Sequence, residues 1–287
     1  MKPSQSLFLE IRGLRYHVRR WPREGARKLF LLHGWMDVSA SFQFLADALH
    51  GEWDLYAPDW RGFGLTQWGK ADCYWFPDYI ADLEEILKSI DSSPVNLVGH
   101  SLGGNVACMY AGIRPQRVAK LVNLEGFGLK PTRAEEAPKR YARWLEELED
   151  PPRLRPYRDF AELAGRLRQG NPRLSEEKAE FLARHWGRDG GEEGVQLRGD
   201  PAHKIVNPVL WRYEEVRACW QQVAAPVLWV DAADSDALQR VGLAAGQYAE
   251  RRAAFRNLRY ESIADAGHML HHDQPEALAR LLEAFLG

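Results

Sequence analysis

The chain has 287 residues, enough for one large α/β domain or for a core domain with an insertion. Its 38 Lys and Arg against 40 Asp and Glu give a formal charge of −2, which leaves no basic excess for a nucleic-acid partner. The sequence lacks a membrane-span-like apolar run, a secretory signal and closely spaced cysteines, so we expect a cytoplasmic protein without a disulfide framework or a Cys-based zinc site.

Strands and helices alternate over the first 125 residues. Two alternating segments around Gly13, at 7–11 and 16–21, predict an antiparallel hairpin at a sheet edge. Short apolar runs of the kind found when both faces of a sheet are covered predict strands at 28–32, 53–57, 95–98 and 118–124. Helical periodicity appears between them, at 39–49, 79–90 and 105–111. This alternation predicts a mostly parallel sheet with right-handed crossovers.

The pattern changes after residue 125. Charged helical stretches separated by Pro and Gly follow at 133–149, 159–169 and 175–186, with no convincing buried strand. Strand and helix patterns return at 227–230, 258–263 and 275–286. We therefore predict a first core part at 1–125, a helical cap or lid insertion at 126–224 and a second core part at 225–287, with a plain surface elaboration as the alternative to a cap.

The most informative stretch is Gly99-His100-Ser101-Leu102-Gly103, which follows one predicted strand and precedes a helix. A chance Gly-x-Ser-x-Gly is expected about 0.1 times in a chain of this length. On a sharp strand-to-helix turn the serine hydroxyl is lifted out of the sheet. We therefore predict that Ser101 is a nucleophile.

A serine nucleophile needs a base that removes its proton, and an acid that orients the base. In strand–turn–helix proteins of this kind the chain order is Ser, acid, His. His268 lies between the last predicted strand and the last helix, on a loop at the same sheet edge as Ser101, and is the predicted base. His271 and His272 are the alternatives.

Two loops offer an acid at this edge. The loop after 227–230 contains Asp231, Asp234 and Asp236, and the strand at 118–124 ends at Glu125. Because both strands end at the active edge, either loop can deliver a carboxylate to the imidazole. We place Asp234 first and Glu125 as the alternative acid.

The oxyanion of an acyl-transfer reaction needs two preset N–H donors. Leu102, directly after the predicted nucleophile, supplies one. The second is predicted at Trp35, in the turn His33-Gly34-Trp35, where Gly34 allows close backbone approach. We interpret His33 as a hydrogen-bonding residue that stabilises this loop.

By its motifs the chain resembles the α/β-hydrolase superfamily over nearly its whole length, and within it capped carboxylesterase-like and serine-hydrolase-like members. The motifs are His33-Gly34-Trp35, Asp59-Trp60-Arg61-Gly62-Phe63-Gly64, Gly99-His100-Ser101-Leu102-Gly103-Gly104 and Gly267-His268. The family commonly shows Gly-x-x-Asp after the penultimate strand, whereas here Ala232-Ala233-Asp234-Ser235 places a serine at the aspartate position. Glu125 occupies the place where some haloalkane dehalogenases, which use an aspartate nucleophile, keep their acid.

The predicted chemistry is hydrolysis of ester-type bonds through an acyl-enzyme, with no metal or cofactor required. The 11 Trp residues and the cap favour small, largely apolar substrates, and the cap arginines Arg140, Arg143, Arg155 and Arg158 are candidates to hold a substrate carboxylate. The alternatives are a thioesterase, lactonase, perhydrolase or C–C bond hydrolase with the same triad, or a ligand receptor with vestigial hydrolysis. We expect a monomer or homodimer.

Overall fold

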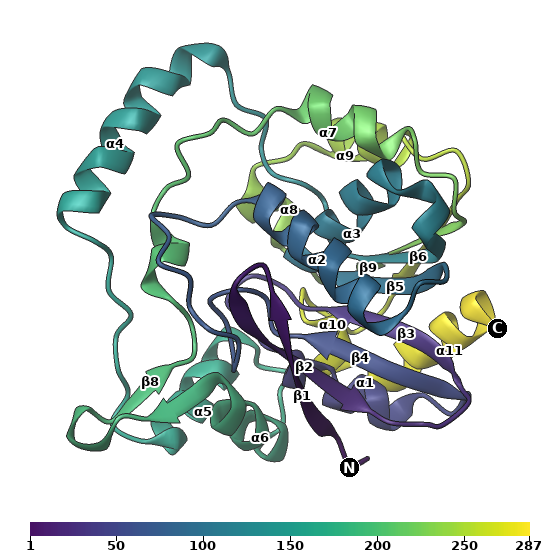
Figure 1. Cartoon of the computed structure of the whole chain (residues 1–287), viewed down its shortest axis with the longest axis horizontal. Helices are drawn as coiled ribbons and strands as arrows, with labels where there is room; N and C mark the ends of the chain where they lie inside the picture. Colours follow the sequence, from purple (N-terminus) through teal and green to yellow (C-terminus); the bar gives the residue numbers. More distant parts are fainter.

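The computed structural model describes residues 1–287 and contains one eight-stranded sheet of order β1-β2-β4-β3-β5-β6-β9-β10 (Figure 1). The strands are β1 (Gln5–Ile11), β2 (Leu14–Trp21), β3 (Arg27–Leu32), β4 (Trp53–Pro58), β5 (Val95–His100), β6 (Val118–Leu124), β9 (Val227–Ala232) and β10 (Leu258–Ile263). The β1–β2 and β2–β4 pairs are antiparallel and all other pairs are parallel. The predicted mostly parallel sheet with an antiparallel hairpin at one edge is confirmed.

Helices cover both faces of this sheet. One face carries α2 (Phe76–Ile90), α3 (Leu102–Ile113), α7 (Tyr213–Trp220), α8 (Ala237–Val241) and α9 (Ala245–Arg252), and the other carries α1 (Gln43–Ala48), α10 (Leu270–Asp273) and α11 (Pro275–Leu286). Successive residues of a strand point to opposite faces. Accordingly, Phe30 and Leu32 belong to the first of two large apolar clusters, while Leu29 and Leu31 belong to the second. The sheet therefore has a separate hydrophobic core on each of its two faces.

A long insertion separates β6 from β9. It contains α4 (Ala137–Glu149), α5 (Phe160–Gly170), α6 (Glu176–Trp186), β7 (Gly187–Asp189) and β8 (Val195–Leu197). Helices α5 and α6 share a small apolar cluster that also includes Phe44 of α1, which fastens this part of the insertion to the core. Helix α4 buries none of its residues and extends away from the sheet in Figure 1.

Two features of this region differ from the sequence prediction. The insertion contains a two-stranded antiparallel sheet, β7–β8, whose strands of three residues each are too short to show an apolar pattern. Helix α7 falls inside the predicted cap at 126–224 but packs against α3, where a Cβ on Gly112 would lie 1.8 Å from the carbonyl oxygen of Cys219. Val216 and Trp220 of α7 are buried in the first core cluster. The core packing therefore resumes before residue 225.

The remaining regular segments are single 3-10 turns at Ser39–Phe42, Pro115–Arg117, Ala134–Glu136, Gly191–Glu193 and Pro201–Lys204. No helix combines the length and the apolar character that crossing a bilayer requires.

Candidate active site

The turn between β5 and α3 has the strained geometry that the pentapeptide predicts. Ser101 has φ 51° and ψ −112°, a backbone conformation that residues with a side chain rarely adopt. Both flanking glycines are required by space. A Cβ on Gly99 would lie 2.4 Å from the carbonyl oxygen of Gly103, and a Cβ on Gly103 would lie 2.1 Å from that of Leu32. The two glycines therefore allow the backbone of the turn to pack closely against α3 and β3.

Three side chains from distant parts of the chain meet at this turn. The Nε2 atom of His268 lies 3.1 Å from Ser101 Oγ, and its Nδ1 atom lies 2.7 Å from Glu125 Oε2. A carboxylate only accepts hydrogen bonds, so Nδ1 carries the proton and Nε2 is free to accept from the serine hydroxyl. The order of contacts is that of a nucleophile, a base and an orienting acid.

Glu125 directly follows β6 and is buried, with φ 55°. Its Oε1 atom accepts a hydrogen bond of 2.9 Å from the backbone N–H of Ala232. Its Oε2 atom accepts from the Ser235 hydroxyl, at 2.6 Å, as well as from His268. Ser235 is the serine found where the family commonly has aspartate, and here it donates to the carboxylate that arrives from the neighbouring strand. Sequence reasoning noted the departure but missed this partnership.

Asp234, the acid placed first from the sequence, is not brought to the imidazole. Its side chain is 48% exposed and forms an ion pair of 2.7 Å with Arg173 of the insertion. The structure brings Glu125, the alternative, to His268 instead. The physical reason is that Glu125 leaves the end of β6 in a left-handed conformation with its side chain buried, whereas Asp234 lies further along an exposed loop.

The other two carboxylates of that loop also have different partners. Asp231 is buried, accepts hydrogen bonds from Tyr248 and Trp229, and has a pKa raised by burial. Asp236 forms an exposed ion pair of 3.1 Å with Arg240.

The two candidate oxyanion donors come from two different turns. Leu102 is the first residue of α3, and Trp35 follows the end of β3. Neither backbone N–H donates a hydrogen bond within the protein. A Cβ on Gly34 would lie 3.3 Å from the Cβ of Ser101, so the absence of a side chain lets this turn approach the serine closely. Both N–H groups are therefore without an acceptor in the protein, in turns that lie beside Ser101.

His33 stabilises the turn at Trp35, as its position in the sequence suggests. Its Nδ1–H donates to the carbonyl of Gly34 at 2.7 Å, and its Nε2 accepts from the N–H of Trp60 at 2.9 Å. Burial lowers the pKa of His33 to about 4, so the ring is neutral and makes both bonds at pH 7.

His100 was not singled out from the sequence. Its Nε2–H donates to the backbone carbonyl of His268 at 2.7 Å and so ties the serine turn to the histidine loop. The alternative bases do not approach Ser101: His272 bonds to Ser41 at 3.1 Å, and the His271 ring lies beside those of His100 and His272. The only sequence signal for His100 was its place inside the pentapeptide.

A cavity of about 630 Å³ opens over the three side chains. Its aromatic lining residues are Trp35, Tyr74, Trp75, Phe76, Tyr79 and Phe127. The cavity wall is thus largely apolar, and Ser101, His268 and Glu125 form a polar part of it.

The four arginines of the insertion that the sequence analysis offers as substrate ligands differ in what they contact. Three pair with glutamates of the insertion: Arg143 with Glu147 at 2.6 Å, Arg155 with Glu162 at 3.1 Å, and Arg158 with Glu162 at 3.3 Å. Arg140 lines the cavity, and its buried Nε has no hydrogen-bond partner.

Comparison with known proteins assigns the class. The sequence pattern of the alpha/beta hydrolase fold family matches residues 28–275, so the chain belongs to this family. It is 26% identical over 281 residues to a serine hydrolase-like protein of Danio rerio, covering 93% of this chain and 83% of that protein.

Solved structures show the same fold. The thioesterase domain from the curacin biosynthetic pathway superposes with a TM-score of 0.88 at 22% identity, covering 98% of this chain and 99% of that one. An esterase from Mycobacterium tuberculosis does so with a TM-score of 0.75 at 19% identity, covering 99% and 92%.

Proposed function

We propose that this protein is a serine hydrolase that cleaves carboxylic-ester-type bonds through a triad of Ser101, His268 and Glu125. The observation that carries the proposal is the position of the His268 ring, between Ser101 Oγ at 3.1 Å and Glu125 Oε2 at 2.7 Å. Membership of the α/β-hydrolase family and similarity to a serine hydrolase-like protein support it.

In the proposed reaction, His268 Nε2 takes the proton of Ser101 Oγ as this oxygen attacks the substrate carbonyl. Negative charge develops on the carbonyl oxygen and is stabilised by the N–H groups of Trp35 and Leu102, each contributing roughly 3–4 kcal/mol in the transition state. The imidazolium is stabilised by Glu125, then donates its proton to the leaving alcohol. Water, deprotonated by the same imidazole, attacks the acyl-enzyme and releases the acid.

The cavity supports a substrate of modest size with an apolar or aromatic group. Its volume of about 630 Å³ lies within the range of small-molecule sites, and its lining is mostly hydrophobic. In the proposed complex the scissile carbonyl lies at Ser101, and the apolar part of the substrate contacts the aromatic side chains that line the cavity.

The proposal is tested by covalent labelling and a substrate panel. A fluorophosphonate probe is expected to modify Ser101 with one-to-one stoichiometry, located by peptide mass spectrometry. Turnover of p-nitrophenyl acetate and butyrate is expected to exceed that of matched thioesters and lactones. Label without measurable turnover of any ester, thioester or lactone contradicts hydrolysis and favours a receptor, while faster thioester turnover shifts the assignment to a thioesterase.

Arg140 is expected to favour esters that carry a carboxylate on the acyl or alcohol side. A charge-assisted hydrogen bond to its guanidinium is worth about 1.5–3 kcal/mol, so Arg140→Gln should raise KM for a hemisuccinate ester roughly 10- to 100-fold and leave KM for a neutral ester of the same length nearly unchanged. Steady-state kinetics on the two esters measure this difference.

Arg143→Gln is the matched control, since Arg143 lies on the same helix but pairs with Glu147. An equal effect of Arg140→Gln on the acidic and the neutral ester would remove the assigned role.

A further inference from the structure

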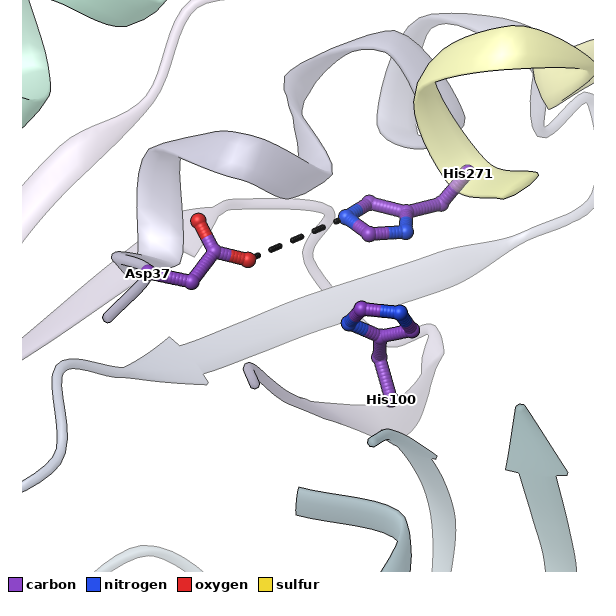
Figure 2. Close-up of side chains that lie close together, drawn as sticks. All are labelled: Asp37, His100 and His271. Atoms are coloured by element: carbon purple, nitrogen blue, oxygen red, sulfur yellow. Dashed lines mark ion pairs between the residues drawn. The ribbon is translucent and has the colours of Figure 1, made fainter. Parts of the chain in front are cut away.

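A second cluster of polar side chains lies next to the candidate active site, and the proposed reaction does not use it. It consists of Asp37 from the loop after β3, His100 at the end of β5 and His271 of α10 (Figure 2). All three are buried, with relative exposures of 2%, 1% and 0%. One ligand-type atom of each lies within 4.8 Å of the other two, and Asp37 Oδ2 is 3.9 Å from His271 Nε2. Figure 2 shows the carboxylate and the two rings converging on one another.

The atoms that converge are those that have no hydrogen-bond partner. Asp37 Oδ2, His100 Nδ1 and both ring nitrogens of His271 are buried without one. Buried polar atoms are nearly always paired, because leaving them unpaired after removal from water is costly. Three such residues facing one another therefore call for a shared partner.

The remaining polar atoms of the Asp37 and His100 side chains form hydrogen bonds that orient these side chains. His100 Nε2–H donates to the carbonyl of His268 at 2.7 Å, which leaves Nδ1 as a bare acceptor pointing at the cluster. Asp37 Oδ1 accepts from the N–H of Val38 at 2.8 Å and from the Ser41 hydroxyl, which leaves Oδ2 unused. Metal-binding histidines and carboxylates are typically oriented by such outer hydrogen bonds.

We propose that Asp37, His100 and His271 bind one divalent transition-metal ion of the zinc type. Two imidazole nitrogens and one carboxylate oxygen suit Zn²⁺ and Co²⁺, whereas Mg²⁺ and Ca²⁺ prefer all-oxygen sites. Bonds of about 2.0–2.2 Å in a tetrahedral site require ligand atoms roughly 3.4 Å apart, so binding draws the three side chains together by about 1 Å.

One of the three residues borders a cavity. Asp37 lines a second cavity, of about 310 Å³, between the insertion and the core, together with Met36 and Met269. Asp37 Oδ2 itself is buried, so an ion reaches it from this cavity only when the side chains around Asp37 move, and water from the cavity would then fill the fourth coordination position of a three-ligand site.

The bound ion would join three segments of the candidate active site. Asp37 follows the turn of Trp35 by two residues, His100 precedes Ser101, and His271 follows His268 by three residues. The ion therefore fixes the positions of these three segments relative to one another. It takes no part in the reaction proposed above. The inference goes beyond the proposed function, and its test measures metal binding only, so the two can fail separately.

Co²⁺ is the probe, because its visible absorption reports coordination geometry. The purified 287-residue chain, dialysed against chelating resin, is titrated with CoCl₂, and bound metal is counted by elemental analysis. We expect one Co²⁺ per chain and the intense d–d bands of a four-coordinate N/O site. Asp37→Asn and His271→Gln are each expected to lower the affinity by at least about 100-fold, more than the usual cost of losing an outer hydrogen bond.

Two control variants are expected to bind Co²⁺ with the affinity of the wild-type protein. His50→Gln removes an exposed histidine, and Ser101→Ala removes the candidate nucleophile. Substoichiometric binding by the wild type at 100-fold excess of Co²⁺, or binding that survives both Asp37→Asn and His271→Gln, overturns the proposal. So does binding that depends on Ser101.

A measurement without substitutions guards against variants that do not fold. Crystals of the wild-type protein soaked in ZnCl₂ are expected to show an anomalous difference peak between these three side chains. Such peaks only elsewhere on the protein, or none, would contradict the site.

Discussion

Replacement of Ser101 by alanine is expected to reduce kcat for ester hydrolysis by about 10⁴- to 10⁶-fold, because the acyl-enzyme can no longer form. The residual rate would come from substrate binding and from the N–H groups of Trp35 and Leu102, which the substitution leaves in place. The fold should be retained, since alanine keeps the Cβ and removes only the hydroxyl that bonds to His268. Initial rates with p-nitrophenyl butyrate, together with circular dichroism and thermal melting, measure both expectations.

Ser92→Ala serves as the control, since Ser92 is an exposed serine outside the site. A Ser101→Ala protein that is folded and keeps more than about a tenth of the wild-type kcat would exclude Ser101 as the nucleophile, because removal of that group abolishes covalent catalysis.

Replacement of Glu125 by glutamine is expected to lower kcat by about 10⁴-fold, whereas Asp234→Asn should change it less than about threefold. Glutamine fills the same space, but its amide nitrogen is a donor facing His268 Nδ1, and it favours the tautomer whose Nε2 is protonated. In that tautomer the ring cannot accept the proton of Ser101. Asp234 is an exposed partner of Arg173, and pairs of this kind contribute little.

The comparison of these two variants tests the assignment of the acid. Both remove one negative charge from loops at the same sheet edge, so a general electrostatic effect would lower both rates alike. A larger loss in Asp234→Asn than in Glu125→Gln would show that the loop at Asp234 moves to the imidazole during catalysis. In that case Glu125 would not be the orienting residue.

Much of this fold follows from patterns within a few residues of one another. Continuous apolar runs, such as Leu29–Leu32, mark strands covered on both faces, and alternation around Gly13 marks the edge hairpin. The candidate nucleophile is also a local signal, because strand, Gly-x-Ser-x-Gly and helix are contiguous. His268 was predictable because only one histidine lies between the last strand and α10.

The sequence by itself thus indicated the alternation of strands and helices in the core, the turn at Ser101 and the edge of the sheet at which the candidate site lies. Only the tertiary structure decided that Glu125 and not Asp234 reaches His268, that Ser235 supports it, and that α7 packs with the core. The same holds for the cluster of Asp37, His100 and His271. The reason is that apolar periodicity over a few residues locates strands and helices along the chain. The contacts named above join residues that are far apart in the sequence, in some cases by more than two hundred positions. Whether two such side chains meet depends on the exact path of the loops that carry them, and periodicity does not encode that path.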